Sequence, residues 1–344
     1  MNNFQSRFID FMDRKEQFGD KKTVLIFDGL NIFLRSFQAV PVMNDNGDHI
    51  GGFLGFYRSL RKLLLDFSPD KVIVVFDGKG GSMRRRKIYK EYKDKRISAG
   101  TFNRFSDFKG QINETDSLKV QLAHLVSFLG CLPVHTIVPD GIEADDCIAY
   151  SVREYIDTLY PEPPHKIIVS SDKDFLHLIK EDISVYSHST KSLITQENIK
   201  EIFGYTPENY LTLRCFTGDR ADNITGAKSV GPKSLNKHFD LDGNNQVTIQ
   251  DIFKKSEEEL AGGSKLKLFS NIIKSKEEVM RNYLLMQLLD VDISGQIKSQ
   301  IRSNLQSEVP SLDLICMQRL FSDYGLNKEV NDLLAWKSIF KHLN

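Results

Sequence analysis

The chain has 344 residues and a formal net charge of zero, because 46 lysine and arginine residues balance 46 aspartate and glutamate residues. Its content of 40% hydrophobic and 27% charged residues is typical of globular proteins and excludes disordered and collagen-like chains. The longest purely apolar runs, such as residues 72–76, cover about five residues, whereas a membrane span needs roughly 20. At about 100 to 200 residues per domain, this length predicts two or three domains.

Residues 1–22 precede the first predicted strand and form an N-terminal extension. Charged residues alternate there with aromatic and aliphatic ones, and no continuous apolar segment of a signal peptide is present. We therefore expect a cytoplasmic protein that makes no contact with a membrane.

Three β-branched apolar segments at 23–27, 71–76 and 166–170 predict buried strands, and a weaker strand is expected at 133–138. Helical patterns at 55–67 and 117–129 separate them, which predicts an α/β domain over 23–195 with a parallel sheet flanked by helices on both faces. Residues 196–344 predict a helical C-terminal domain. Its helices are expected at 208–216, 233–239, 277–289 and 327–343.

Four cysteines, at positions 131, 147, 215 and 316, lack CxxC spacing and lie among apolar residues. This pattern favours reduced, buried thiols over disulfides or a zinc site.

A strongly basic segment runs from Lys79 to Lys109, with eleven lysine or arginine residues against three acidic ones. Its cations alternate with Tyr89 and Tyr92, and Phe102, Phe105 and Phe108 follow at intervals of three. Phosphate neutralisation combined with aromatic stacking is typical of a path for single-stranded nucleic acid, whereas the alternative is a solvated helix. The candidate nucleic-acid-binding residues here are Arg84, Arg85, Arg86, Lys87, Lys90 and Tyr92.

Carboxylates gather at predicted strand ends and helix starts. Two strands end in Asp-Gly, and three acidic blocks follow at 143–146, 172–174 and 219–222. Taken singly, each could be a turn, a helix N-cap or a favourable charge on a helix dipole. Together they predict one metal site built from Asp28, Asp77, Glu143, Asp145, Asp146, Asp172, Asp174, Asp219 and Asp222.

So many carboxylates in one place repel one another, by about 4 kcal/mol per pair at 4 Å and an effective dielectric near 20. Hard divalent cations such as Mg²⁺ or Mn²⁺ relieve this repulsion, and two of them can promote hydrolysis of a phosphodiester. The eight histidines form no HExxH motif, and no serine nucleophile elbow is present.

These motifs, in this order and spacing over residues 23 to about 240, resemble the flap endonuclease and 5′-to-3′ exonuclease family, closest to phage replication nucleases of the RNase H type that remove RNA primers. The resemblance implies a PIN-like core with a helical arch at about 79–115. It implies that the first carboxylates serve one metal ion, and that Asp172, Asp174, Asp219 and Asp222 serve a second. It also implies catalytic roles for Asp28 and Asp77. Lys93 and Arg96, which belong to the element Tyr92-Lys93-x-x-Arg96, are implied to be catalytic as well.

The segment 224–238 resembles the helix-hairpin-helix of that family, with Gly226 and Gly231 in the turn and Pro232 opening a helix. Amides at the helix start, with Lys228 and Lys233, would bind a duplex phosphate, although the pattern alone is also that of a helix cap. By resemblance, backbone carbonyls and Ser229 would hold a K⁺ ion.

The implied activity is structure-specific 5′ nuclease action on flaps, nicks and RNA primers during DNA replication, by a monomer that meets a replication protein such as a single-strand-binding protein. A phage origin would place it in the host cytoplasm. One alternative is a phosphatase of the haloacid dehalogenase type, but that mechanism needs a second aspartate where this chain has Leu30. The other is a non-catalytic DNA-binding module, in which such a repulsive carboxylate set would have no use.

Overall fold

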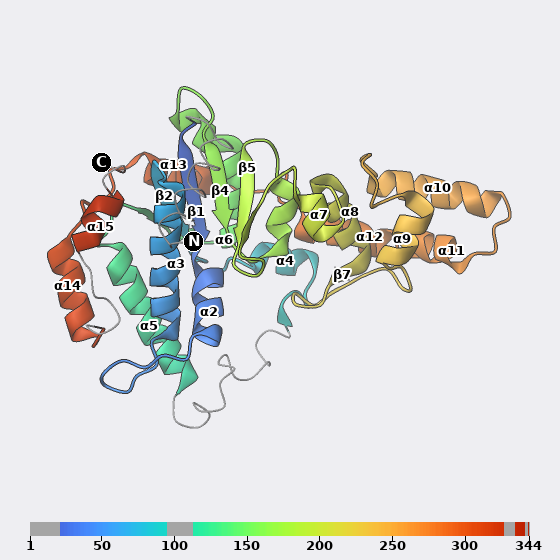
Figure 1. Ribbon diagram of the computed structural model, residues 1–344. Coiled ribbons are helices and arrows are strands. Elements are labelled where there is room, and N and C mark those ends of the chain that lie inside the picture. The colour runs from blue at the N-terminus through green and yellow to red at the C-terminus, as the bar shows by residue number, and fades with distance from the viewer. Residues whose placement is uncertain (1–20, 95–112, 327–333, 341–342, 344) are drawn as a thin grey trace, which may run out of the picture.

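The computed structural model describes residues 21–94, 113–326, 334–340 and 343 (Figure 1). At its centre is a six-stranded sheet in the order β3-β2-β1-β4-β5-β6. The strands are β1 (Thr23–Asp28), β2 (Lys71–Val75), β3 (His135–Ile137), β4 (His165–Val169), β5 (Ile183–Ser187) and β6 (Ser192–Ile194). Strands β1 to β5 pair in parallel and β6 pairs antiparallel to β5, so that the carboxyl ends of β1, β2 and β4 share one edge.

The sheet separates two hydrophobic cores, because alternate residues of each strand point to opposite faces. Leu25 and Phe27 of β1 lie in the core against α2 (Gly29–Ala39), α3 (Gly51–Phe67) and α5 (Glu114–Leu129). Val24 and Ile26 lie in the other core, against α6 (Ala144–Tyr150) and the helical half of the chain. The predicted α/β fold with helices on both faces is therefore confirmed.

The connections on the second face are short helices. They are the π-helical turn η3 (Ser151–Tyr155) and the 3-10 helices η4 (Ile156–Leu159) and η5 (Lys173–Leu178). The three strongest strand predictions are confirmed, but β5 and β6 were missed and β6 makes the sheet mixed. Ser184, Ser187 and Ser192 interrupt the apolar pattern of these two strands, which explains why the sequence does not reveal them.

The helical half contains a small hairpin, β7 (Gly218–Asp219) and β8 (Ile224–Thr225). Its helices are α7 (Ile199–Phe203), α8 (Pro207–Thr217), α9 (Pro232–Phe239), α10 (Ile249–Ala261), α11 (Lys267–Lys274), α12 (Lys276–Met286), α13 (Gly295–Gln306), α14 (Leu314–Asp323) and α15 (Leu334–Ile339). Helices α10 and α11 lie at the opposite end of the molecule from α14 and α15 in Figure 1.

The last two helices return to the sheet domain. Met317 and Phe321 of α14 pack with Phe53 and Phe128, and the indole of Trp336 on α15 donates a hydrogen bond to the hydroxyl of Tyr57 at 2.9 Å. A helix was predicted over 327–343. Within that range α15 covers Leu334–Ile339, whereas residues 327–333 and 341–342 lie outside the described part.

One disulfide corrects the prediction of four reduced thiols. Cys131, after α5, is bonded to Cys316 of α14, with their Cα atoms 6.0 Å apart. The two residues are 185 positions apart, so only the return of α14 to the sheet domain brings them together. Cys147 and Cys215 are free and buried, as predicted.

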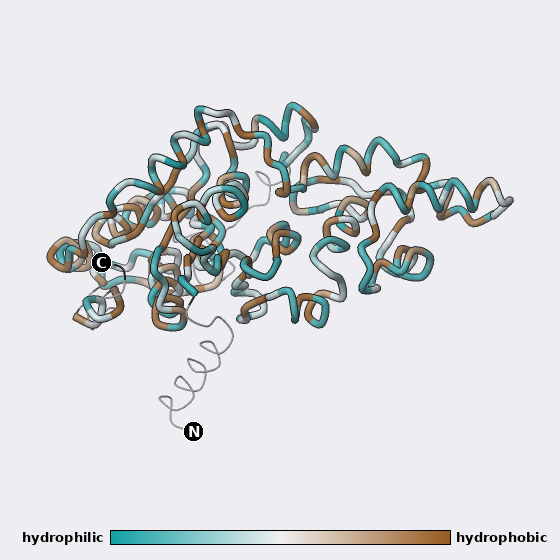
Figure 2. Tube along the Cα trace, turned by 90° about the horizontal axis from the view of Figure 1, so that it is seen from above, coloured by the Kyte–Doolittle hydropathy of each residue, from teal (hydrophilic) through white to brown (hydrophobic). Residues whose placement is uncertain are grey.

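Hydrophobic and hydrophilic positions alternate along the helices in Figure 2. Among the described residues, no helix combines the length and the apolar character that crossing a membrane requires.

Candidate active site

The carboxylates predicted from sequence lie around the edge where β1, β2 and β4 end. Asp28 is the last residue of β1 and caps α2, where it accepts a hydrogen bond from the amide of Asn31 at 3.2 Å. Its other oxygen accepts a hydrogen bond from the hydroxyl of Ser170, at the end of β4 (2.9 Å). Asp77, just after β2, accepts one from the amide of Ala144 at the start of α6 (2.9 Å). The parallel topology thus brings distant blocks to one place.

A first group of carboxylates belongs to the start of α6 and surrounds Arg85 of α4 (Met83–Ile88). The Arg85 side chain is 1% exposed and forms ion pairs with Glu143, Asp145 (3.1 Å) and Asp146 (2.9 Å). Arg84 adds an ion pair with Asp146 at 3.0 Å. These carboxylates therefore have resident counter-cations.

Lys93 and Tyr92 connect this first group of carboxylates to the loop between β7 and β8. The ammonium of Lys93 forms an ion pair with Glu143 and lies 4.9 Å from the centre of the Tyr92 ring. The Tyr92 hydroxyl lies 3.1 Å from Glu143 Oε2 and 3.3 Å from Asp222 Oδ2. Burial raises the pKa of Tyr92, so the phenol stays protonated and acts as a donor. The backbone amide of Lys93 donates to the carbonyl of Asp222 at 2.9 Å, which joins the segment around Lys93 to the loop between β7 and β8.

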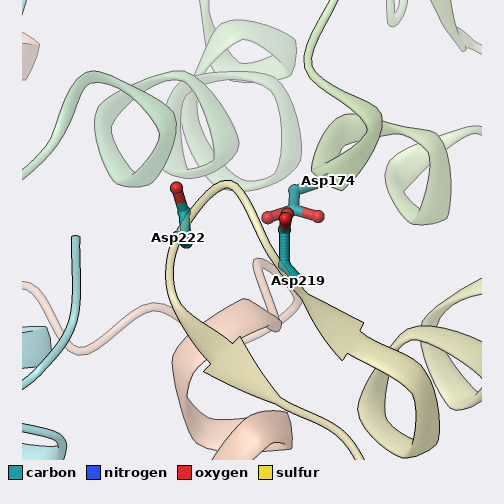
Figure 3. Close-up of side chains that lie close together, drawn as sticks. All are labelled: Asp174, Asp219 and Asp222. Carbon is teal, nitrogen blue, oxygen red and sulfur yellow. The ribbon is translucent and has the colours of Figure 1, made fainter. Parts of the chain in front are cut away.

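A second group consists of Asp174, Asp219 and Asp222 (Figure 3). Asp174 comes from η5, Asp219 ends β7, and Asp222 lies in the loop that joins β7 to β8. One oxygen from each lies within 4.8 Å of the others, a spacing that could hold a metal ion. Arg214 of α8 forms ion pairs with Asp174 (2.8 Å) and with Asp219.

Burial makes ionisation of several of these carboxylates unfavourable. Burial, reinforced by the nearby charge of Asp172, raises the pKa of Asp28 to about 7. Burial together with the mutual repulsion of Asp172 and Asp174 raises the pKa of Asp172 to about 6, and burial does the same for Asp174 despite Arg214. Burial likewise raises the pKa of Asp77. A carboxylate set of this kind fits a hard divalent cation, which supplies the missing positive charge.

Two of the predicted DNA-binding residues are placed differently by the structure, and this corrects their role. Arg85 is buried among carboxylates, and Tyr92 is only 2% exposed and also points at them, so neither side chain faces solvent where a strand would lie. The physical reason is that buried carboxylates attract the nearest cation and phenol more strongly than water does. Arg84 also turns inward, to Asp146.

The remaining basic residues of this segment are accessible. Lys87 and Lys90 are exposed, and Arg86 is half-exposed and paired with Asp94 at 2.7 Å. Arg96 lies outside the described residues, as do Phe102, Phe105 and Phe108.

The segment 224–238, which resembles a helix-hairpin-helix, contains the predicted helix. This helix, α9, begins at Pro232 with Gly231 as its N-cap. The two glycines of the turn differ. A Cβ atom on Gly226 would lie 2.4 Å from the carbonyl of Thr217, so this position needs glycine. Gly231 has φ −138° and no atom within 4 Å of its virtual Cβ, so the expectation that it is required for the turn is wrong. Lys228 and Lys233 are exposed beside it.

Sequence reasoning missed Arg214 and Ser170. Both contact predicted site carboxylates, Arg214 from within α8 and Ser170 from the end of β4. A signal for Arg214 was present, because a lone arginine in the otherwise uncharged segment 209–217 implies a buried partner.

Comparison with known proteins agrees with this geometry. The family described as "5′-3′ exonuclease, N-terminal resolvase-like domain" matches residues 23–204, more than half of the chain. The chain therefore belongs to the 5′-3′ exonuclease family, which confirms the predicted resemblance.

Two relatives illustrate the match. The 5′-3′ exonuclease of Aquifex aeolicus is 28% identical over 301 residues, which are 85% of this chain and 93% of the relative. DNA polymerase I of Deinococcus radiodurans is 32% identical over 237 residues, which are 69% of this chain but only 22% of that polymerase.

Two solved structures share the fold. The T5 D15 protein co-crystallised with metal ions is 22% identical, with a TM-score of 0.58 over 94% of this chain and 100% of the other. The bacteriophage T5 D15 flap endonuclease in a complex with DNA and metal ions is 23% identical, with a TM-score of 0.56 over 88% and 98% of the two chains.

Proposed function

We propose that this nuclease cuts DNA flaps and RNA primers at their 5′ ends during DNA replication, with two Mg²⁺ or Mn²⁺ ions in each active site. The observation that carries the proposal is the second carboxylate group, in which one oxygen each of Asp174, Asp219 and Asp222 lies within 4.8 Å of the other two. Oxygen-only donors at this spacing suit hard divalent cations rather than zinc in a thiol or imidazole site.

Divalent ions would supply activation of the attacking water and neutralisation of charge on the phosphate. Asp28, Asp77 and Asp145 would hold one ion at the edge of the sheet. Asp172, Asp174, Asp219 and Asp222 would hold the other, and three of these four already bring an oxygen within 4.8 Å of one another. Glu143 orients Lys93 and Tyr92, and Asp146 anchors Arg84 and Arg85 in the metal-free protein.

Lys93 is the residue that we expect to act on the reacting phosphate. Its side chain is one-fifth exposed and its ammonium pairs with Glu143, so a phosphate drawn to the metal site would meet it there. A positive charge at that place stabilises the developing negative charge of the transition state. Arg96 is expected to assist from the same segment.

Duplex DNA would bind at the helix-hairpin-helix segment, residues 224–238. The start of α9 lies beside Lys228 and Lys233, and the positive end of a helix dipole together with these cations favours a phosphate group. We expect carbonyls of residues 224–231 and Ser229 to bind K⁺ there. Contacts of this kind position DNA without reading its sequence, which suits a replication nuclease. We also expect a cytoplasmic monomer that works beside a single-strand-binding protein.

The test uses 5′-labelled flap, nicked and single-stranded substrates with and without Mg²⁺. The wild-type protein should cleave the flap and the nicked duplex only when Mg²⁺ is present. Asp77→Asn should abolish cleavage yet keep DNA binding, because basic groups supply most of the affinity. Asp323→Asn, an exposed carboxylate on α14, serves as the matched control and should cleave normally. Cleavage by Asp77→Asn at the wild-type rate would remove this carboxylate from the site.

A further inference from the structure

The two carboxylate groups of the active site hold their arginines in different ways. The guanidinium of Arg85 uses all three nitrogens: Nε donates to the carbonyl of Leu285 on α12 at 2.9 Å, and both terminal nitrogens donate to carboxylates of α6. At 1% exposure, Arg85 is fixed in place by every donor that it has.

Arg214 is held by a single nitrogen. Its Nη2 contacts both Asp174, at 2.8 Å, and Asp219, whereas its Nε is buried and has no hydrogen-bond partner among the described residues. The side chain is 16% exposed. A guanidinium that bridges two carboxylates through one atom acts as a point charge there, because its planar fork is not used.

This point charge occupies oxygens that a metal ion would need. Asp174, Asp219 and Asp222 form the group that could hold a cation, and Arg214 pairs with two of the three. With Arg214 in place, the formal charge of this group is −2 rather than −3. The arginine therefore relieves the repulsion between the carboxylates when no ion is bound, and competes with an ion that arrives.

The backbone that carries Arg214 is not free to move. The side chain of Asn282 is buried and donates to the carbonyls of Cys215, next to Arg214, and of Thr225, which ties α8 to α12 and to β8. Any displacement of the guanidinium must come from rotation of its own side chain.

We propose that Arg214 is a displaceable counter-cation of the group Asp174, Asp219 and Asp222, which stabilises the ion-free site and lowers its affinity for a divalent ion. The inference rests on the proposed function, since it gives that group a metal ion to bind. It predicts that this ion site fills at a higher concentration than the site at the sheet edge. Arg214 is thus a positioning residue that sets the concentration of divalent ion at which this second ion site fills.

The experiment is calorimetric titration of the full chain with Mn²⁺ in the absence of DNA, for the wild type, Arg214→Gln and Arg214→Lys. Arg302→Gln is the matched control, because Arg302 lies on α13 and binds the hydroxyl of Tyr150 at 2.6 Å. The melting temperature of each variant is also measured over the same range of Mn²⁺ concentrations. The rise in melting temperature with Mn²⁺ then allows the variants to be ranked by ion affinity even where one of them is weakly folded.

We expect two classes of Mn²⁺ site in the wild type. Arg214→Gln should tighten the weaker class by about tenfold or more and leave the stronger class unchanged, because one competing charge has been removed. It should also melt at a lower temperature without ions, whereas Arg214→Lys should keep the wild-type affinity and Arg302→Gln should change neither class.

Unchanged or weaker binding by Arg214→Gln would overturn the inference, because it would make Arg214 a structural support of the two aspartates. That result would leave the proposed function intact, since the wild type would still bind two classes of ion. A wild type that binds no Mn²⁺ at all would instead refute the metal site itself, and the inference with it.

Discussion

Asp28→Asn should make the ion-free protein more stable at neutral and alkaline pH. The Asp28 side chain is 9% exposed at the junction of β1 and α2, and its two oxygens accept hydrogen bonds from the amide of Asn31 and the hydroxyl of Ser170. Asparagine has the same shape and retains the oxygen that caps α2, but its NH2 group cannot accept the hydrogen bond from Ser170. The substitution therefore removes the negative charge and one hydrogen bond.

The expected gain follows from the pKa of Asp28. Burial and the charge of Asp172 raise the pKa of Asp28 to about 7, whereas an unfolded aspartate titrates near 3.9. Between these values the native protein binds more protons than the unfolded chain, so the free energy of unfolding falls as the pH rises. Three pKa units at about 1.4 kcal/mol each give a penalty of up to about 4 kcal/mol above pH 7. At pH 4.5 the penalty is less than about 1 kcal/mol.

Urea unfolding in the presence of EDTA, followed by circular dichroism at pH 4.5 and pH 8, measures this difference. The opposite sign is expected for Asp182→Asn. Burial opposes ionisation of Asp182, but its ion pair with the fully buried ammonium of Lys166 lowers the pKa of this carboxyl below its usual range. Removing that partner should destabilise the protein by about 1–3 kcal/mol at pH 8, because Lys166 retains only Asp157.

Divalent ions should reduce the difference in the free energy of unfolding between the wild type and Asp28→Asn. Mg²⁺ or Mn²⁺ compensates the buried charge of Asp28, which only the wild type carries. The reasoning is refuted if Asp28→Asn is no more stable than the wild type at pH 8 without ions. It is also refuted if the gain is equal at pH 4.5 and pH 8, because a charge effect must shrink when the native carboxyl is protonated.

Three further substitutions test the rest of the site. Lys93→Ala should lower the single-turnover cleavage rate by about 10² or more with little change in DNA affinity, and a loss of affinity at an unchanged rate would make it a phosphate tether. Arg85→Gln should lower the free energy of unfolding by about 3–5 kcal/mol, because it removes the buried guanidinium that three carboxylates share. A variant of normal stability whose DNA binding merely depends less on salt would contradict this prediction. Gly226→Ala should cost about 2 kcal/mol or more of stability and weaken duplex binding, while Gly231→Ala stays within about 0.5 kcal/mol of the wild type; equal effects in a denaturation series would refute the turn geometry.

The sequence alone determined the parallel centre of the sheet and predicted a carboxylate site at the ends of its strands. Strands β1, β2 and β4 each contain an uninterrupted apolar run of three or more residues, and this local signal predicts a buried strand. The carboxylates follow because a parallel sheet collects the residues after its strands at one edge. Asp28 and Asp77 could therefore be assigned to one site without knowing any contact between them.

Only the tertiary structure decided which cation meets which anion. Arg85 and Lys87 look alike in the sequence, yet Arg85 is buried with Glu143 and Asp146 while Lys87 is exposed. The same holds for Arg214, whose partner Asp174 lies 40 positions away, and for the cysteine pair 185 positions apart. A charge or a thiol has the same identity wherever it lies. Which partner it meets depends on the desolvation and packing of segments far apart in the chain, and a local pattern does not identify that partner.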